Sequence, residues 1–184
     1  MDENMQLRKT LFLLLLTLFA LPLAGCTTVA PDLDAQDQIA IYAAAVRQLY
    51  TVDDTFGGTL QPPVLYIVAT TEDVSGDPDL DAGDPTPIPA AVQSGVSAAL
   101  ADLPTTIRWV DSREEVDLDP ETGEVVGGGA IVTLGNILPE SETRALVPAG
   151  IYIANLAAGG QTYVVEQQDG TWSVTGTTGV QWIS

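Results

Sequence analysis

The chain has 184 residues, with 25 acidic and six basic side chains, no histidine and a formal net charge of −19. Such an acidic surface repels nucleic acid and anionic lipid head groups, and the lack of histidine excludes a Ser-His-Asp triad and histidine-bound metals. The single cysteine, Cys26, excludes an intrachain disulfide and a cysteine-based zinc site.

The N-terminal segment combines basic residues, an apolar run and small residues in front of the cysteine. Arg8 and Lys9 precede the apolar run 11–20, and the tetrapeptide Leu23-Ala24-Gly25-Cys26 follows it. This order is typical of a secretory signal peptide. The apolar run is too short for a membrane span of about 20 residues, and Pro22 interrupts it.

The tetrapeptide before and at the cysteine resembles the lipobox of bacterial lipoproteins. The resemblance implies that residues 1–25 are a lipoprotein signal peptide and that Cys26 becomes the lipidated first residue of the mature protein. It also implies an extracytoplasmic location, anchored to the cell membrane or envelope, with the membrane as partner. Thr27 after the cysteine would permit outer-membrane placement. We expect residues 26–36 to be a short linker and residues 37–184 to form one domain.

The first part of the expected domain has one helical and one strand-like segment. Apolar side chains at helical spacing predict a helix over 34–50, with Asp34 or Asp37 as its cap. Pairs of glycine and proline then break the chain. The run 64–69 is continuously apolar and rich in β-forming residues, which predicts a buried strand.

The segment 72–89 predicts a long loop, because it is rich in proline and has little apolar surface to bury. Its alternating carboxylates are typical of calcium-binding loops. The candidate Ca²⁺ ligands are Asp73, Asp77, Asp79, Asp81 and Asp84. The spacing departs from an EF-hand, because Ala82 stands sixth from Asp77, where a glycine is required. The favoured interpretation is a solvated, self-repelling loop, and Ca²⁺ is the only cofactor that the sequence suggests.

The second half of the chain predicts one more helix and several strands. Apolar residues on one face predict a helix over 90–103, which Pro104 ends. Strands are expected at 105–110, 129–134, 144–156, 161–167 and 171–183. Turns are expected at 139–142, 157–160 and 169–170. The pentapeptide 119–123, with proline early and glycine late, suits a hairpin closure.

These elements define the expected fold class. Short connections favour antiparallel neighbours. We therefore expect an α+β domain with two helices on one face of an antiparallel, meander-like sheet of about five to six strands. The order of elements is also similar to that of cystatin-like and nuclear-transport-factor-like cones, which is an analogy of fold alone.

The last third of the chain resembles uncharacterised exported proteins of bacteria. The shared features are the hairpin Gly170-Thr171-Trp172-Ser173-Val174, of the form Gly-x-Trp-x-Val, and the ending Trp182-Ile183-Ser184. This group implies no catalytic residue for the present chain.

Three further sets of side chains have a functional and a structural interpretation. The neighbouring carboxylates Asp53 with Asp54, and Glu114 with Glu115, would suit a hydrolase only if a pair faced one cleft. The aromatic residues form either a binding platform or part of the core, and alternation favours the core for Trp109 and Trp172. The possible platform comprises Trp109, Trp172, Trp182, Tyr152 and Tyr163. Arg108 and Arg113 would hold an anion or pair with nearby acids.

The sequence therefore predicts a membrane-tethered, non-catalytic binding or structural module. The alternatives are a small-ligand or calcium-binding pocket protein and a carboxylate-based hydrolase. An apolar pocket with a few polar groups would favour a ligand binder. Acids that converge in a cleft would favour an enzyme, and an exposed apolar patch an interaction module.

Overall fold

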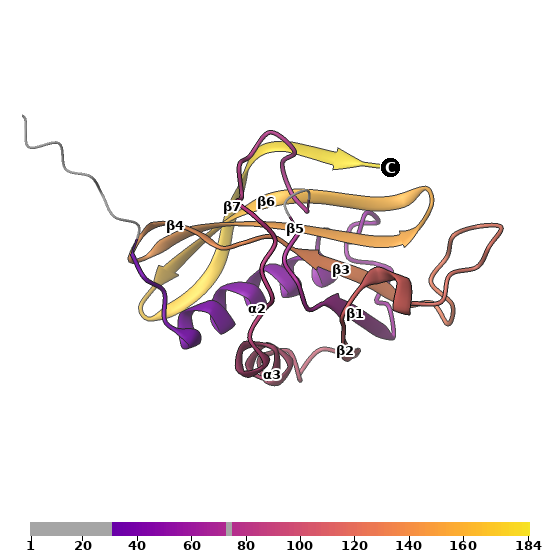
Figure 1. Ribbon diagram of the computed structural model, residues 1–184, viewed down its shortest axis with the longest axis horizontal. Helices are drawn as coiled ribbons and strands as arrows, with labels where there is room; N and C mark the ends of the chain where they lie inside the picture. Colours follow the sequence, from indigo (N-terminus) through magenta and orange to yellow (C-terminus); the bar gives the residue numbers. More distant parts are fainter. Residues whose placement is uncertain (1–30, 73–74) are drawn as a thin grey trace, which may run out of the picture.

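The computed structural model describes residues 31–72 and 75–184, so the expected signal peptide, Cys26 and Asp73 lie outside the described residues. This part of the chain forms two helices and a seven-stranded sheet, which confirms the α+β class (Figure 1). The helices are α2 (Ala35–Thr51) and α3 (Ala90–Ala99), with a 3-10 turn η1 (Arg113–Glu115). The strands are β1 (Val64–Val68), β2 (Thr106–Val110), β3 (Ala130–Leu134), β4 (Leu138–Ser141), β5 (Arg144–Ala154), β6 (Ala157–Gln168) and β7 (Thr171–Ile183).

The sheet is mixed rather than antiparallel. Its order is β2-β1-β3-β5-β6-β7, with β4 paired to β5. β1 runs parallel to β2 and β3, and the other pairs are antiparallel. The expected antiparallel sheet of five to six strands is therefore wrong in strand number and in direction. The connections 69–105 and 111–129 are long enough to cross the sheet, and parallel neighbours require such crossovers.

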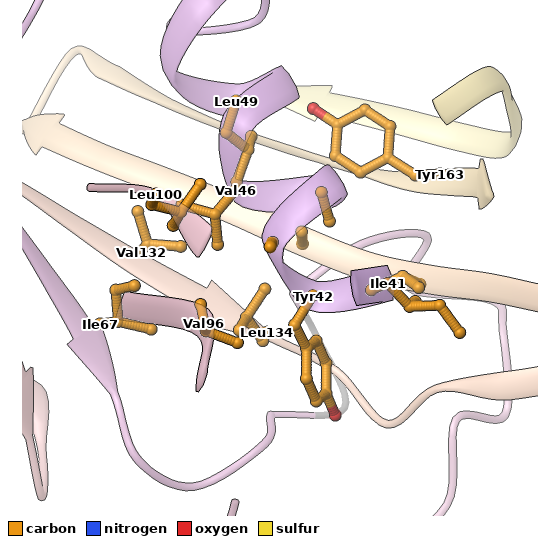
Figure 2. Close-up of a cluster of buried hydrophobic side chains, with 14 of the residues drawn as sticks. Ile41, Tyr42, Val46, Leu49, Ile67, Val96, Leu100, Val132, Leu134 and Tyr163 are labelled. Atoms are coloured by element: carbon orange, nitrogen blue, oxygen red, sulfur yellow. The ribbon is translucent and has the colours of Figure 1, made fainter. Parts of the chain in front are cut away.

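α2 begins where the sequence predicts, two residues before the expected domain boundary at residue 37. Asp34 Oδ1 accepts hydrogen bonds from the N–H groups of Gln36 (2.8 Å) and Asp37 (2.9 Å). These bonds satisfy two of the donors that a first helical turn leaves free. Its buried face includes Ile41, Tyr42, Val46 and Leu49 (Figure 2). Burying one large aliphatic side chain contributes roughly 1.5–3 kcal/mol, so this face ties the helix firmly to the sheet.

α3 ends at Ala99, earlier than the expected end at Leu103. Arg47 of α2 explains the difference. Its Nη2 donates to the carbonyl oxygen of Ala99 (3.0 Å) and to the Asp102 carboxylate (2.7 Å). A cation at the last carbonyls caps a helix, so the chain turns away after this point.

Two segments that were expected as turns belong to strands. Pro139 lies in β4, a short strand paired with one end of β5, where a missing N–H group is tolerated. Residues 157–160 begin β6, and the tight turn lies at 155–156 instead. The small residues of this segment leave room for the backbone at Ser75, which passes close above it. A Cβ atom on Gly160 would lie 2.2 Å from the carbonyl oxygen of Ser75.

The two faces of the sheet are covered differently. Both helices pack on one face and form the main core with β1, β3, β5, β6 and β7 (Figures 1 and 2). A smaller cluster on the other face contains Val68, Val116, Val125 and Ile131. It lies under the segment 116–126, whose predicted turn is confirmed by Gly123 at φ +70° and by the pairing of Leu118 with Val125. Within the described part of the chain, the remainder of this second face, here called the open face, carries no α-helix.

Trp172 occupies a core position, as its alternation with Val174 predicts. Its side chain is 6 % exposed, and Nε1 donates to Asp37 Oδ1 at 2.8 Å. Trp109 is only half-buried at the β2 edge, where Nε1 donates to Ser97 Oγ (2.9 Å).

We expect Trp172→Ala to lower the free energy of unfolding by about 3–5 kcal/mol, because it leaves a large cavity under α2. Trp172→Phe keeps one ring and loses the hydrogen bond and part of the indole volume, so its effect is smaller, about 1–3 kcal/mol. Urea denaturation followed by circular dichroism measures both. Val180→Ala, at an exposed position of the same strand, is the control. An unchanged midpoint for Trp172→Ala would contradict the core assignment.

Candidate functional site

A pocket of about 540 Å³ lies on the open face of the sheet. This volume falls within the range of roughly 300–1,000 Å³ that is typical of small-ligand sites. The strands contribute Ile131, Thr133, Gly150, Tyr152, Ala158 and Trp182. Glu72 and Pro78 line it from the long loop, Arg113 from η1, and Ser184 from the end of the chain. The lining is mainly apolar, with a few polar groups.

Glycines in the strands beneath the pocket let two of its walls lie close to the sheet. Gly150 of β5 and Gly160 of β6 are partners in the sheet. A Cβ atom on Gly160 would lie 2.4 Å from Trp182 Nε1, so the indole rests directly on the glycine backbone. A Cβ atom on Gly150 would lie 3.0 Å from the Ser75 carbonyl oxygen. Glycine at these positions therefore lets Trp182 and the loop stand over the sheet as walls.

Tyr152 is an aromatic wall held in a fixed orientation. Its hydroxyl hydrogen-bonds to the carbonyl oxygen of Gly123 (2.8 Å) and to Asn155 Oδ1 (3.1 Å). The guanidinium carbon of Arg113 lies 5.0 Å from the centre of the ring. Such a cation–π contact at an exposed site contributes about 0.5–1 kcal/mol. Among residues 31–72 and 75–184, Arg47 and Arg144 form ion pairs and Arg113 forms none. The pocket wall thus carries a cation, held over the Tyr152 ring, that has no ion-pair partner within the described ranges.

The candidate aromatic platform is divided between the two faces. Trp182 and Tyr152 line the pocket, whereas Trp172 and Tyr163 belong to the core under α2 and Trp109 packs against that core. Sequence alternation identifies the core positions. It does not identify the two pocket residues, because they meet only through the pairing of β5, β6 and β7.

The acidic loop lies on the sheet and is anchored to it at several points. The N–H group of Asp77 donates to Thr162 Oγ1 (3.1 Å), and Asp77 Oδ1 accepts from the N–H group of Asp79 (3.0 Å). Asp81 Oδ1 accepts from the N–H group of Gly83 (3.2 Å). In the described part of the chain no three acidic side chains converge to hold a metal ion. Calcium binding that includes Asp73 and Asp84 stays a prediction, since Asp73 lies outside the described residues.

Asn136 anchors the acidic loop, and no sequence pattern marks it. Its Oδ1 accepts hydrogen bonds from the hydroxyls of Thr71 and Thr86, both at 2.8 Å. Its Nδ2 donates to the carbonyl oxygens of Ala82 (2.8 Å) and Asp84 (2.9 Å). One amide group next to the end of β3 therefore holds both ends of the loop. It also holds the backbone of Ala82 and Asp84 within the loop.

The neighbouring carboxylates do not form pairs. Asp54 is fully buried, and it accepts hydrogen bonds from the N–H groups of Phe56 (2.9 Å), Gly58 (2.7 Å) and Leu60 (2.8 Å). Asp53 instead accepts a hydrogen bond from the Tyr163 hydroxyl (3.0 Å). The two carboxylates thus accept hydrogen bonds from different parts of the chain. Asp54 holds the loop that follows α2 in its observed conformation.

Glu114 and Glu115 are exposed on η1. A hydrogen bond from Ser112 lowers the pKa of Glu114, and Glu115 Oε1 accepts from the N–H group of Asp111 (3.2 Å). Arg108, the other candidate anion ligand, is exposed on the edge strand β2 and does not line the pocket. None of these side chains therefore adds chemistry to the pocket.

We expect Asp54→Ala to lower the free energy of unfolding by about 3 kcal/mol, because three backbone N–H groups lose a charged acceptor. Asp111→Ala removes an exposed carboxylate and is expected to change stability by less than about 0.5 kcal/mol. Thermal and urea denaturation of both variants measure the difference. Equal effects of the two substitutions would show that Asp54 does not organise the loop.

No protein-family model matches this chain, and no curated protein or solved structure shows significant similarity to it. None of the helices in the described ranges is both long and apolar enough to cross a membrane.

Proposed function

We propose that the protein is a lipid-anchored, extracytoplasmic binding module that holds a small, largely apolar ligand on the open face of its sheet. The observation that carries this proposal is the pocket of about 540 Å³ with Tyr152 and Trp182 in its walls and Arg113 beside them. Aromatic walls contribute contact area, and a single cation orients a polar group of the ligand. We propose binding rather than catalysis, because Asp53 and Asp54 accept hydrogen bonds from separate structural partners, and Glu114 and Glu115 are exposed outside the pocket.

The anchoring part of the proposal rests on the sequence. Leu23-Ala24-Gly25-Cys26 resembles a lipobox, and α2 starts at Ala35. An extended linker between the cysteine and the helix spans about 30 Å, so the domain would sit close to the membrane surface. A net charge of −19 works against direct adsorption to anionic lipids, which makes a covalent lipid the plausible attachment.

The analogy to cystatin-like and nuclear-transport-factor-like cones remains part of this proposal. The two helices on one face and the pocket on the other support it. The parallel pairing of β1 with β2 and β3 limits it to the general arrangement.

We expect Cys26→Ser to release the protein from membranes or to leave an uncleaved precursor, because the serine has no thiol to accept a lipid. Cell fractionation and intact-mass spectrometry measure location and acylation. Ser184→Ala, at the other end of the chain, is a control that leaves the lipobox unchanged. A Cys26→Ser protein that stays in the membrane, together with an unacylated wild type, would disprove lipid anchoring.

The pocket part of the proposal is tested with indole as a planar apolar probe. We expect the full chain in lipid nanodiscs to bind indole saturably in calorimetric titration, after subtraction of empty nanodiscs. Ala158→Phe fills the pocket and is expected to abolish binding, and Trp182→Ala removes one wall and is expected to weaken it about tenfold.

The matched control is Ala101→Phe, the same substitution at an exposed turn outside the pocket. It is expected to bind indole like the wild type. Melting curves show whether each variant is folded. Wild-type affinity in folded Ala158→Phe would place the probe elsewhere and refute this pocket as the ligand site.

A further inference from the structure

A second, smaller cavity lies at the C-terminal end of α2, and it is independent of the pocket on the open face. Its volume is about 200 Å³, below the usual range for drug-sized ligands. Its lining includes Val52, Asp53, Thr55, Gln161 and Gln181. The cavity therefore suits a ligand of only a few heavy atoms in a polar setting.

A chain of hydrogen bonds fixes which polar atoms of this cavity remain available. Burial raises the pKa of Tyr163 well above its usual range, so its hydroxyl stays protonated. That hydroxyl donates its only hydrogen to Asp53 Oδ2 (3.0 Å), and Gln48 Nε2 donates to the same oxygen (3.1 Å). Gln161 Nε2 donates to the Tyr163 oxygen (2.8 Å), which fixes the orientation of its amide.

Two acceptor oxygens are left over from this network. No hydrogen bond among the described residues reaches Asp53 Oδ1 or Gln161 Oε1. Gln161 is only 6 % exposed, so its free oxygen has little access to bulk water apart from the cavity that it lines. The available atoms of the network are thus acceptors, and the ligand must supply donors.

The electrostatic setting favours a positive charge. The cavity lies at the C-terminal end of α2, which carries the negative pole of the helix dipole. The last turn of α2 has no basic residue, and Asp53 forms no ion pair within the described part of the chain. A carboxylate beside a negative helix end is an unfavourable arrangement, which a bound cation would relieve.

Thr55, at the rim of this cavity, is strained. Its φ of 68° is in the left-handed region, which a β-branched residue rarely adopts. Its Oγ1 is buried without a hydrogen-bond partner among the described residues. Strained backbone of this kind concentrates at ligand-binding sites.

We infer that this cavity binds a small primary ammonium ion, with its N–H groups donating to Asp53 Oδ1 and Gln161 Oε1. A primary ammonium has three donors and no acceptor, so two of its N–H groups can meet the two oxygens left by the network. A divalent metal fits less well, because calcium takes six to eight oxygen ligands and this cavity offers one carboxylate.

The experiment compares cations of equal charge and different hydrogen-bonding capacity. Ethylammonium chloride is titrated into the full chain in detergent, with unfolding temperature and calorimetric heat as readouts. We expect saturable binding and a rise in unfolding temperature with concentration. Tetramethylammonium has the charge without N–H donors, ethanol has the size without the charge, and sodium chloride reproduces the ionic strength. None of these three is expected to bind saturably.

Variants separate this site from general charge effects. Asp53→Asn keeps the shape of the side chain and is expected to weaken ethylammonium binding at least tenfold. Asp117→Asn removes the same charge at an exposed position and is expected to change nothing. Val52→Lys places a tethered ammonium at an exposed position beside the cavity. This variant is expected to have a higher unfolding temperature than the wild type and to show no response to ethylammonium.

Three results would overturn the inference. They are the absence of a saturable response in the wild type, an equal response to tetramethylammonium or sodium, and wild-type affinity in folded Asp53→Asn. The indole titration reports on the other pocket, so the two proposals succeed or fail separately.

Discussion

The attachment of α2 to the C-terminal hairpin is the interaction on which the rest of the structure depends. Near its first turn, Asp37 accepts a hydrogen bond from Trp172 of β7, and beyond its last turn, Asp53 accepts one from Tyr163 of β6. Between these points, Ala45 and Val46 are fully buried against the sheet. The partners are separated by 135 and 110 residues, so the helix cannot complete its packing until the last strands have formed. Such long-range contacts are typical of slow folding.

The same hairpin determines the contrast between the two faces of the sheet. Where β5, β6 and β7 meet the helices, their side chains are mostly apolar, as Val147 and Trp172 show. Tyr163 of β6 lies in the same cluster (Figure 2). On the opposite face, Gly150 and Gly160 let the loop at Ser75 and the indole of Trp182 lie directly on the strands, beside the pocket. One face therefore supplies the stability of the domain and the other supplies room for a ligand.

Local signals in the sequence were sufficient for the parts of the fold that depend on neighbouring residues. Asp34 identified the start of α2, the apolar run identified β1, and the proline and glycine of 119–123 identified a turn. Strand direction could not be predicted from local signals, because the parallel pairing of β1 depends on the paths of two long connections. Glycine marks turns in most sequences, so residues 157–160 resemble a turn, whereas in this fold glycine permits close approach within a strand.

The candidate sites were less accessible to sequence reasoning than the fold. Arg113, Tyr152 and Trp182 appeared among the candidate side chains, but nothing in their spacing joined them in one pocket. Asp53 and Asp54 were paired as sequence neighbours, and the backbone turn between them sends one to Tyr163 and the other to its own loop. No sequence pattern identified Gln161 as a candidate ligand, because the orientation of its amide depends on a hydrogen bond to Tyr163, two residues away on the same strand.

Asn136 holds the two ends of the acidic loop together, and this affects how the chain can change over evolutionary time. Thr71 and Thr86 both donate hydrogen bonds to one amide oxygen, so the two ends of the loop stay together whatever the length of its exposed part. Closing a loop twice as long costs only about 0.6 kcal/mol more. Insertions at the exposed positions Pro78 and Asp79 are thus expected to cost the core little, whereas Ser75 and Ala82 are buried and fix the path of the loop on either side. Glu72 and Pro78 lie in the same interval and line the pocket. Related chains can therefore reshape one wall of the pocket by changing loop length alone, while the strands beneath it remain the same.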